Sequence, residues 1–200
     1  SFRTVPERKE YTRLTSIIKY SWQAYSMHSW KNISARKNIL YEAKAKIKAL
    51  EKVINIFDKD SHGVVFSMTK DYSNTVKKRL GDKCLAHHSG INKKTRINNL
   101  KKFADGRTKV KILSSAKTLD EGVNLPRLEY GILMASSSKA KQQNQRVGRC
   151  IRVGKDGKHA IIIRIYCKDT QEEEWVNSSQ SKLKVINVKN IQELIKLINK

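Results

Sequence analysis

The sequence is short of acidic residues, and this shortage excludes a chain whose charges are balanced merely for solubility. Its 200 residues include 18 Asp and Glu against 42 Lys and Arg, which gives a formal net charge of +24. A charge of this size favours a polyanionic partner, and nucleic acid is the commonest one. An anionic membrane surface or an acid-rich protein is the alternative partner on charge alone.

Cysteine is scarce, and long apolar runs are missing. Cys84, Cys150 and Cys167 are odd in number and form no C-x-x-C pair, which excludes a disulfide framework and a cysteine zinc site. We therefore expect a reducing, intracellular compartment, either cytoplasm or nucleus. No apolar run approaches the ~20 residues that span a bilayer, so we expect no membrane partner. The sequence begins with Ser1, from which we expect a piece of a longer polypeptide.

Residues 1–57 are expected to form a helical extension that packs on or leads into a core at residues 58–200. After Pro6 this first part holds no Gly or Pro, and its clearest stretch, residues 35–57, has apolar residues at steps of three and four. We expect the lysines of this stretch on the opposite face. The apolar stripe consists of Ile39, Leu40, Ala43, Ile47, Leu50, Ile54 and Phe57.

In residues 58–200, short apolar runs alternate with helical stretches that end at glycines such as Gly81 and Gly106. This alternation predicts an α/β fold, a parallel sheet sandwiched by helices. Ligands of such sheets gather beyond the carboxyl ends of the strands. Residues 170–182 are polar and are expected to form a loop. Strands are predicted near residues 64–68, 84–88, 109–115, 130–136, 159–168 and 184–188, and helices near 70–82, 92–106, 139–149 and 190–200.

The stretch "NQRVGRCIR" holds Arg146, Arg149 and Arg152 around Gly148, with no carboxylate to pair with them. On a helix that ends here, Arg149 and Arg152 share a face. Arginine presents a rigid donor fork that matches phosphate oxygens, so the stretch predicts a phosphate-binding site. A solvated basic surface is the plain alternative.

A second motif follows the third predicted strand, where "SSAKTLDEGVNLP" combines hydroxyl, acidic and glycine residues. Together with "VVFSMT", "LAHHSG" and "QNQRVGRCIR", it resembles in order and spacing motifs IV, V and VI of superfamily 2 helicases and translocases. The resemblance covers residues 63–167. It is closest in Q-R-x-G-R-x-x-R, which looks like motif VI, and it is most similar to DNA repair and viral or phage-type recombination helicases.

The resemblance implies that the chain is the second, C-terminal RecA-like domain of an ATP-dependent motor. Arg149 and Arg152 would be arginine fingers that stabilise charge on the γ-phosphate. Residues lining or coupling the ATP cleft would be Gln145, Arg146, Gly148, Glu121, Gly122 and Asn124. Nucleic-acid backbone contacts would come from Ser67, Thr69, His88, Ser89, Gly90 and Ser115, for which surface or capping roles are the alternative.

The sequence contains no G-x-x-x-x-G-K-[ST] loop and no D-E-x-x box. In the family these belong to the N-terminal RecA-like domain, which we expect as a partner in the same chain and as the main binding site of ATP and Mg²⁺. The chain alone is therefore expected to be inactive as an ATPase. The resemblance favours DNA over RNA. The alternative function is a non-catalytic, basic nucleic-acid-binding module on a parallel sheet.

Several other residues have two interpretations. For His87 and His88 a role at a strand end is favoured over a metal site, because no third ligand is suitably spaced. The acidic run that begins at Glu172 is interpreted as a solvated turn in preference to a nuclease site. Trp22 and Trp30 are expected to anchor the helical part on the sheet, with base stacking as the alternative. Cys150 is assigned to packing.

Overall fold

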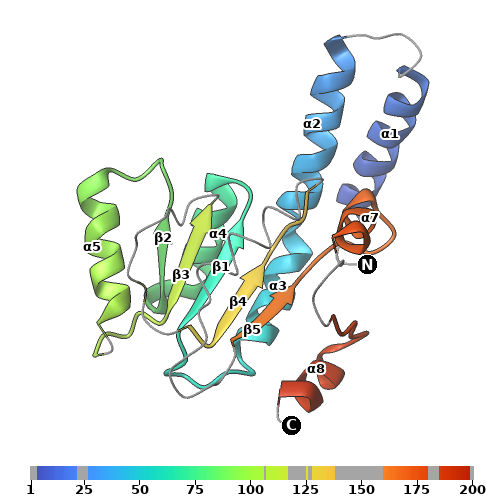
Figure 1. Ribbon diagram of the computed structural model, residues 1–200. Helices are drawn as coiled ribbons and strands as arrows, with labels where there is room; N and C mark the ends of the chain where they lie inside the picture. Colours follow the sequence, from blue (N-terminus) through green and yellow to red (C-terminus); the bar gives the residue numbers. More distant parts are fainter. Residues whose placement is uncertain are drawn as a thin grey trace.

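A five-stranded parallel sheet lies at the centre of the computed structural model, which describes residues 4–21, 27–105, 107–116, 125, 128–137, 160–179 and 185–198. The strand order is β2-β3-β1-β4-β5, and every neighbouring pair is parallel. Helices pack on both faces (Figure 1), which confirms the predicted α/β class. The strands are β1 (Gly63–Ser67), β2 (Cys84–His87), β3 (Ile112–Ala116), β4 (Tyr130–Leu133) and β5 (Ile161–Arg164).

Two apolar cores hold the helices on the sheet. Helices α3 (Lys44–Ile54) and α4 (Lys70–Leu80) contribute to one core, and α5 (Lys93–Ala104) contributes to the other. Successive residues of a strand point to opposite faces, so in β1 Val65 joins the first core and Val64 the second. Continuous apolar strands are therefore required here, because both faces are covered.

The ends of the core helices follow from local side chains. The Thr69 hydroxyl caps α4 by accepting a hydrogen bond from the Tyr72 N–H at 3.2 Å, and the Asn92 side chain caps α5 by accepting from the Thr95 N–H at 2.8 Å. Gly81 ends α4 with a φ of 62°, a conformation that favours glycine. The helix stop predicted at Gly81 is thus confirmed.

Gly63, the first residue of β1, is a glycine because of a close approach. A Cβ at this position would overlap the ring of the buried Tyr130, which pairs with Gly63 across the sheet. The Tyr130 ring in turn stacks on Phe57, with ring centroids 4.1 Å apart. Gly63 therefore lets an aromatic pair close this end of the first core.

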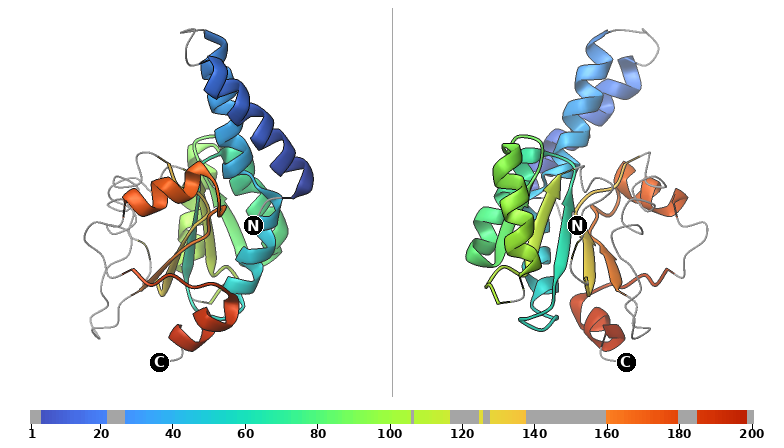
Figure 2. Two further views of the ribbon diagram at one scale, coloured as in Figure 1. Left: turned by 90° about the vertical axis from the view of Figure 1, so that its right-hand side faces the viewer. Right: turned by 60° about the vertical axis from the view of Figure 1, so that its left-hand side comes forward.

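Helices α1 (Val5–Ser21) and α2 (Met27–Tyr41) pack on each other and project past the edge at which the strands end (Figures 1 and 2). We call this pair the helical arm. A break at Ala43 separates α2 from α3, and Ala43 offers no side-chain cap. Instead, the Glu7 carboxylate of α1 accepts a hydrogen bond from the Lys44 N–H at 3.0 Å. The start of α1 thereby caps the start of α3.

The polar stretch 170–182 is not the predicted loop, because helix α7 (Gln171–Ser178) occupies most of it. The Thr170 hydroxyl accepts a hydrogen bond from the Glu172 N–H at 3.2 Å and begins the helix. Three glutamates in the first turn, Glu172 among them, complement the positive end of the helix dipole. Polar composition was the reason for the wrong prediction, although the same residues are good helix starters.

The last part of the chain matches its prediction only in part. Residues 185–188 form no strand, contrary to the expectation, whereas α8 (Ile191–Ile198) is the predicted amphipathic helix. The division of the chain at residues 57 and 58 stays a prediction. Among the described helices, none combines the length and the apolar character that crossing a membrane requires.

Candidate functional site

The carboxyl ends of β1, β2 and β3 bring polar residues together at one edge of the sheet. The register pairs His87 of β2 with Ser115 of β3, and Ala116 of β3 with Ser67 of β1. His88 follows directly at the end of β2. Three residues predicted to contact nucleic acid, Ser67, His88 and Ser115, therefore lie at the ends of three adjacent strands, on the side from which the arm projects (Figure 1).

These predicted contact residues differ in exposure. Ser67 and Ser115 are 3% and 0% exposed, whereas Ser89 and Gly90 are exposed to solvent. The Ser67 hydroxyl is buried without a hydrogen-bond partner in the described part of the chain, which is uncommon for a buried polar group. Thr69 has the capping role that the sequence left open as an alternative. Among the predicted contact residues, Ser89 and Gly90 are therefore the exposed ones.

The His88 side chain holds the turn at Ser89 and Gly90 in place. Its Nδ1 accepts a hydrogen bond from the Gly90 N–H at 3.2 Å, so its Nε2 carries the proton and donates to the Asn74 Oδ1 of α4 at 2.9 Å. Burial, followed by the positive charge of Lys70, lowers the pKa of His88 below its ordinary value of 6.5. The imidazole is thus a neutral support for the turn, in agreement with the predicted strand-end role.

The predicted nucleotide-site residues lie outside the residues that the structure describes. They are Arg149, Arg152, Gln145, Arg146, Gly148, Glu121, Gly122 and Asn124. Their roles stay predictions. Glu121, Gly122 and Asn124 lie in sequence between β3 and β4, and the arginine stretch lies between the end of β4 and the start of β5. That connection starts at the same edge as the cluster described above, because all strands are parallel.

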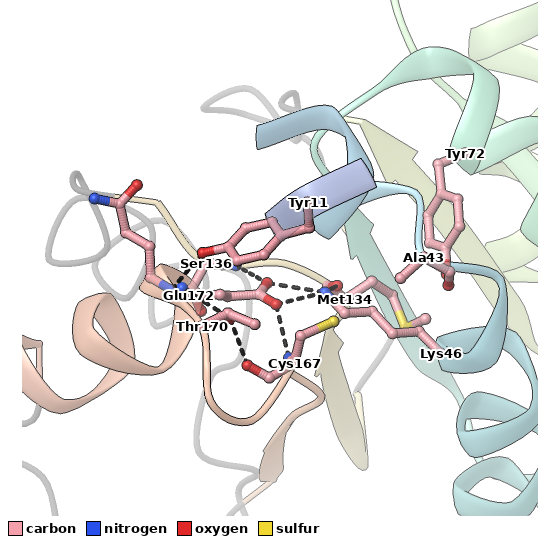
Figure 3. A network of polar contacts seen from close by, with 10 residues as sticks. Tyr11, Ala43, Lys46, Tyr72, Met134, Ser136, Cys167, Thr170 and Glu172 are labelled. Atoms are coloured by element: carbon pink, nitrogen blue, oxygen red, sulfur yellow. Dashed lines mark hydrogen bonds and ion pairs between the residues drawn. The ribbon is translucent and has the colours of Figure 1, made fainter. Parts of the chain in front are cut away.

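A buried ion pair that the sequence did not predict lies beside the end of β4 (Figure 3). Lys46 of α3 and Glu172 of α7 are both 0% exposed, and the Lys46 Nζ is 2.8 Å from each carboxylate oxygen. Glu172 was interpreted as part of a solvated turn, and the lysines of α3 were placed opposite the apolar stripe. Both expectations are wrong for this pair, because each charge has its partner in the interior.

The surroundings of the pair satisfy all of its polar atoms. Glu172 accepts hydrogen bonds from the N–H groups of Ser136 at 2.9 Å and Cys167 at 2.8 Å, and the Lys46 Nζ donates to the Met134 carbonyl at 2.8 Å. Burial, helped by the Glu172 charge, raises the pKa of the nearby Tyr41 to about 12. One sequence signal was available, since Lys46 lies three residues after a stripe position, Ala43, and four before another, Leu50.

The helical arm carries exposed aromatic side chains on a basic background. Trp30 of α2 is 72% exposed and Tyr20 of α1 is 78% exposed, so Trp30 does not anchor the arm on the sheet as expected. Trp22 lies outside the described residues. Between Glu10 and Glu42 the sequence has no acidic residue. The arm contains the basic residues Arg13, Lys19, Lys31, Arg36 and Lys37 in this interval.

The described residues form neither a metal-binding group of side chains nor a reactive thiol. Their His, Cys, Asp and Glu side chains include no group of three or more arranged to hold a metal ion. Cys84 and Cys167 are buried free thiols, and burial raises the pKa of Cys84 to about 12. A thiol of this kind is inert as a nucleophile. Cys150 lies outside the described part.

Comparison with known sequences finds a matching family model and a curated relative. The model of the helicase conserved C-terminal domain family matches residues 45–154, which is more than half of the chain. The DNA 3'-5' translocase XPB2 of Sulfurisphaera tokodaii is 27% identical over 135 residues. That alignment includes 68% of this chain but spans only 29% of the length of the translocase. These relatives give no support to the viral or phage-like assignment.

Solved structures with the same fold are also domains of this kind. The C-terminal domain of Saccharomyces cerevisiae Dbp5, bound to Gle1 and IP6, has a TM-score of 0.59 and 18% identity, and the match covers 77% of this chain and 89% of that C-terminal domain. The C-terminal part of the Fun30 ATPase domain has a TM-score of 0.57 and 25% identity, covering 77% and 52%. The chain belongs to the helicase conserved C-terminal domain family and is the C-terminal RecA-like domain of a superfamily 2 helicase or translocase.

Proposed function

We propose that this domain is the second half of an ATP-dependent DNA motor, in which Arg149 and Arg152 act as arginine fingers. The observation that carries the proposal is the spacing Q-R-x-G-R-x-x-R in residues 145–152, on the connection that follows β4 of a family-typical sheet. Guanidinium groups beyond the carboxyl end of a strand meet the region where parallel sheets bind ligands. There they would stabilise the charge that develops on the transferred phosphoryl group.

ATP and Mg²⁺ would bind mainly to a preceding RecA-like domain of the same polypeptide. The present chain lacks the phosphate-cradling loop, and its described residues offer no cluster of carboxylates for a metal. Among its proposed cleft residues, the three arginines and Gln145 have the chemistry that fits the phosphates of the nucleotide. The bound nucleotide would supply the energy of phosphoryl transfer. This domain would supply positive charge and the contacts to nucleic acid.

DNA is the proposed track of the motor. The charge of +24 supports binding to a polyanion, and the curated relative is named as a DNA translocase. At the sheet edge, the exposed Ser89–Gly90 turn suits contacts to phosphate oxygens, which do not read the base sequence. The arm provides a second basic surface, on which Trp30 and Tyr20 are available for stacking on bases.

A basic nucleic-acid-binding module without motor activity is the second candidate. In that case the arginines of residues 146–152 would bind backbone phosphate, and their removal would weaken DNA binding alone. The family membership favours the motor, since the matched region extends from α3 through the arginine stretch.

The deciding experiment uses the natural polypeptide that contains this chain. DNA-stimulated ATP hydrolysis is compared among the native protein, Arg149→Ala, Arg152→Ala and the matched control Arg107→Ala. Arg107 is an exposed arginine on the turn after α5. Loss of a finger is expected to reduce kcat by about 10³- to 10⁵-fold, whereas the control keeps the native rate. Native rates in both finger variants would refute the assignment.

A further inference from the structure

Exposed lysines gather around the start of the edge strand β2. Two lie in the last turn of α4, one ends the short 3-10 helix η2 (Gly81–Lys83) that joins α4 to β2, and two lie in the last turn of α5. All five side chains are exposed to solvent. They are Lys77, Lys78, Lys83, Lys101 and Lys102, and we call them the basic flank.

We propose that the basic flank binds the phosphate backbone of duplex DNA, as a contact separate from the sheet edge at which Ser89 and Gly90 lie. The two contacts are at opposite ends of β2, since the flank lies where this strand starts and the turn lies where it ends. The inference goes beyond the proposed function, because this contact does not depend on whether Arg149 and Arg152 act as fingers. Lysine is a compact point charge, so we expect binding without sequence preference.

The fold brings these lysines to one edge of the sheet. Helix α4 leads through η2 into β2 at Cys84, and α5 leads back to the start of β3, so both helices end at the amino edge of the strands. The Lys111 N–H donates to the Lys83 carbonyl at 3.0 Å, and the Thr108 hydroxyl donates to the Lys102 carbonyl at 2.8 Å. Both helices contact β2 and lie at the same end of the sheet (Figure 2).

Acidic side chains do not neutralise the basic flank. Between Asp82 and Asp105 the sequence has no Asp or Glu. Asp105 is bound to Arg107 at 3.1 Å, and among the described residues none of the five lysines forms an ion pair with a carboxylate. Asp82, exposed beside the flank, offers one negative charge against five positive ones. A bound polyanion would relieve the repulsion among these lysines.

Stabilisation of the helix ends alone does not account for the basic flank. A cation in the last turn of a helix interacts favourably with the helix dipole, by about 0.3 to 1 kcal/mol. Arg79 already lies in the last turn of α4, where it also pairs with Glu51 at 2.6 Å. Lys83 lies outside α4 and α5. The flank therefore carries more positive charge than the two helix ends require.

An extended polyanion fits the basic flank better than a small anion does. Helix α4 contributes to the first core and α5 to the second, so the two pairs of helix-end lysines lie on opposite faces of the sheet. A helix with its side chains is about 10–12 Å wide, and a single phosphate therefore cannot bridge the two pairs. Duplex DNA carries one negative charge per ~1.7 Å of its axis, so one duplex supplies phosphates to both.

A membrane surface is a poorer match for the same charges. Helices that bind in the plane of a membrane need apolar side chains beside their cations. In residues 77–83 and 101–104 no large apolar side chain is exposed, and Phe103 is fully buried in the second core. The basic flank thus offers charge without an apolar face, which suits a DNA backbone.

The test compares two variants of the natural full-length protein, each of which replaces four exposed lysines by Gln. The flank variant changes the ends of α4 and α5, and the control removes the same charge elsewhere. Two control positions, Lys52 and Lys196, also lie in the last turn of a helix. The flank variant is Lys77→Gln, Lys78→Gln, Lys101→Gln and Lys102→Gln, and the control is Lys48→Gln, Lys52→Gln, Lys189→Gln and Lys196→Gln.

Fluorescence anisotropy of a labelled duplex of mixed sequence gives the dissociation constant over a range of salt concentrations. Each phosphate contact contributes about 0.9 to the slope of log affinity against log salt. The slope of the flank variant is therefore expected to be shallower than native by about three to four. Its affinity at low salt is expected to fall about tenfold or more, whereas the control stays within about threefold of native.

ATP hydrolysis separates the basic flank from the motor itself. With saturating DNA, the kcat of the flank variant is expected to stay native, while the DNA concentration for half-maximal stimulation rises. A fall in kcat with saturating DNA would place these lysines in the motor cycle and overturn the inference. A native protein without DNA-stimulated ATPase activity would refute the proposed function, and the binding measurement would still decide the inference.

Equal affinity and equal salt dependence of the flank variant and its control would overturn the inference. It is also overturned if the flank variant loses binding to phosphatidylserine vesicles but keeps native affinity for the duplex, since the ligand would then be a membrane surface. Should the combined variant fail to fold, the pair in α4 and the pair in α5 are replaced separately. Each pair is then expected to reduce the salt slope by about two.

Discussion

Lys46 and Glu172 form an ion pair of 2.8 Å in the interior, although 126 positions separate them in sequence. The pair joins the helix that leads out of the arm to the helix that follows β5. Removal of either partner would leave the other charge buried and unpaired, which is strongly destabilising.

Replacement of Lys46 by Met is expected to destabilise the domain by about 3 to 5 kcal/mol, because it leaves the Glu172 carboxylate buried without its counter-ion. The measurement is denaturant unfolding at neutral pH. Lys48→Met, on the exposed face of the same helix, is the control and is expected to stay within about 0.5 kcal/mol of native. Equal stability of the two variants would contradict the described burial.

Replacement of Gly63 by Ala is expected to cost about 1 to 3 kcal/mol, because the new methyl group must displace the ring of Tyr130. A double-mutant cycle with Tyr130→Leu isolates the contact. In the Tyr130→Leu background the added methyl group has room, and we expect its cost to shrink. An identical cost in both backgrounds would show that the two residues do not touch.

His88 is expected to titrate below 6.5 and to be protonated on Nε2 at neutral pH, which ¹⁵N-detected NMR measures directly. Because its pKa is lowered in the folded state, its contribution to stability is present above pH 6.5 and is lost as the pH falls through the folded value. Lys70→Gln removes one cause and should raise the midpoint of His88. The midpoint of His62, which faces Lys111 instead, should not change.

Trp30→Ala is expected to weaken binding of the natural protein to single-stranded DNA by about 1 to 3 kcal/mol, the usual range for a stacked base. Trp30→Phe should retain most of the affinity. Ile97→Ala, at an exposed apolar residue of α5, is the control. Affinity should also fall steeply with salt, in proportion to the phosphates neutralised. Native affinity in Trp30→Ala would exclude the arm from the DNA path.

The sheet could be predicted from the sequence because its signals are local. Runs such as Val64 and Val65 are apolar on both faces, and Thr69 and Gly81 mark the ends of a helix by their own chemistry. The pair of Lys46 and Glu172 could not be predicted in this way. A glutamate within a polar run looks solvated until its partner, far away in sequence, is known.

The exposure of Trp30 on the helical arm could not be predicted from the sequence either. An aromatic residue such as Trp30 is usually buried, and only the fold reveals that α1 and α2 leave the sheet and expose it. The roles of Arg149 and Arg152 came from motif spacing alone and stay predictions, because these residues lie outside the described part.

The most direct measurement of the motor assignment follows ATP hydrolysis and DNA affinity in parallel for Arg149→Ala in the natural full-length protein. The motor function predicts a fall in kcat of about 10³-fold or more with DNA affinity close to that of Arg107→Ala. A variant that hydrolyses ATP at the native rate but binds DNA more weakly would contradict the motor function and identify the arginine stretch as a plain phosphate-binding surface.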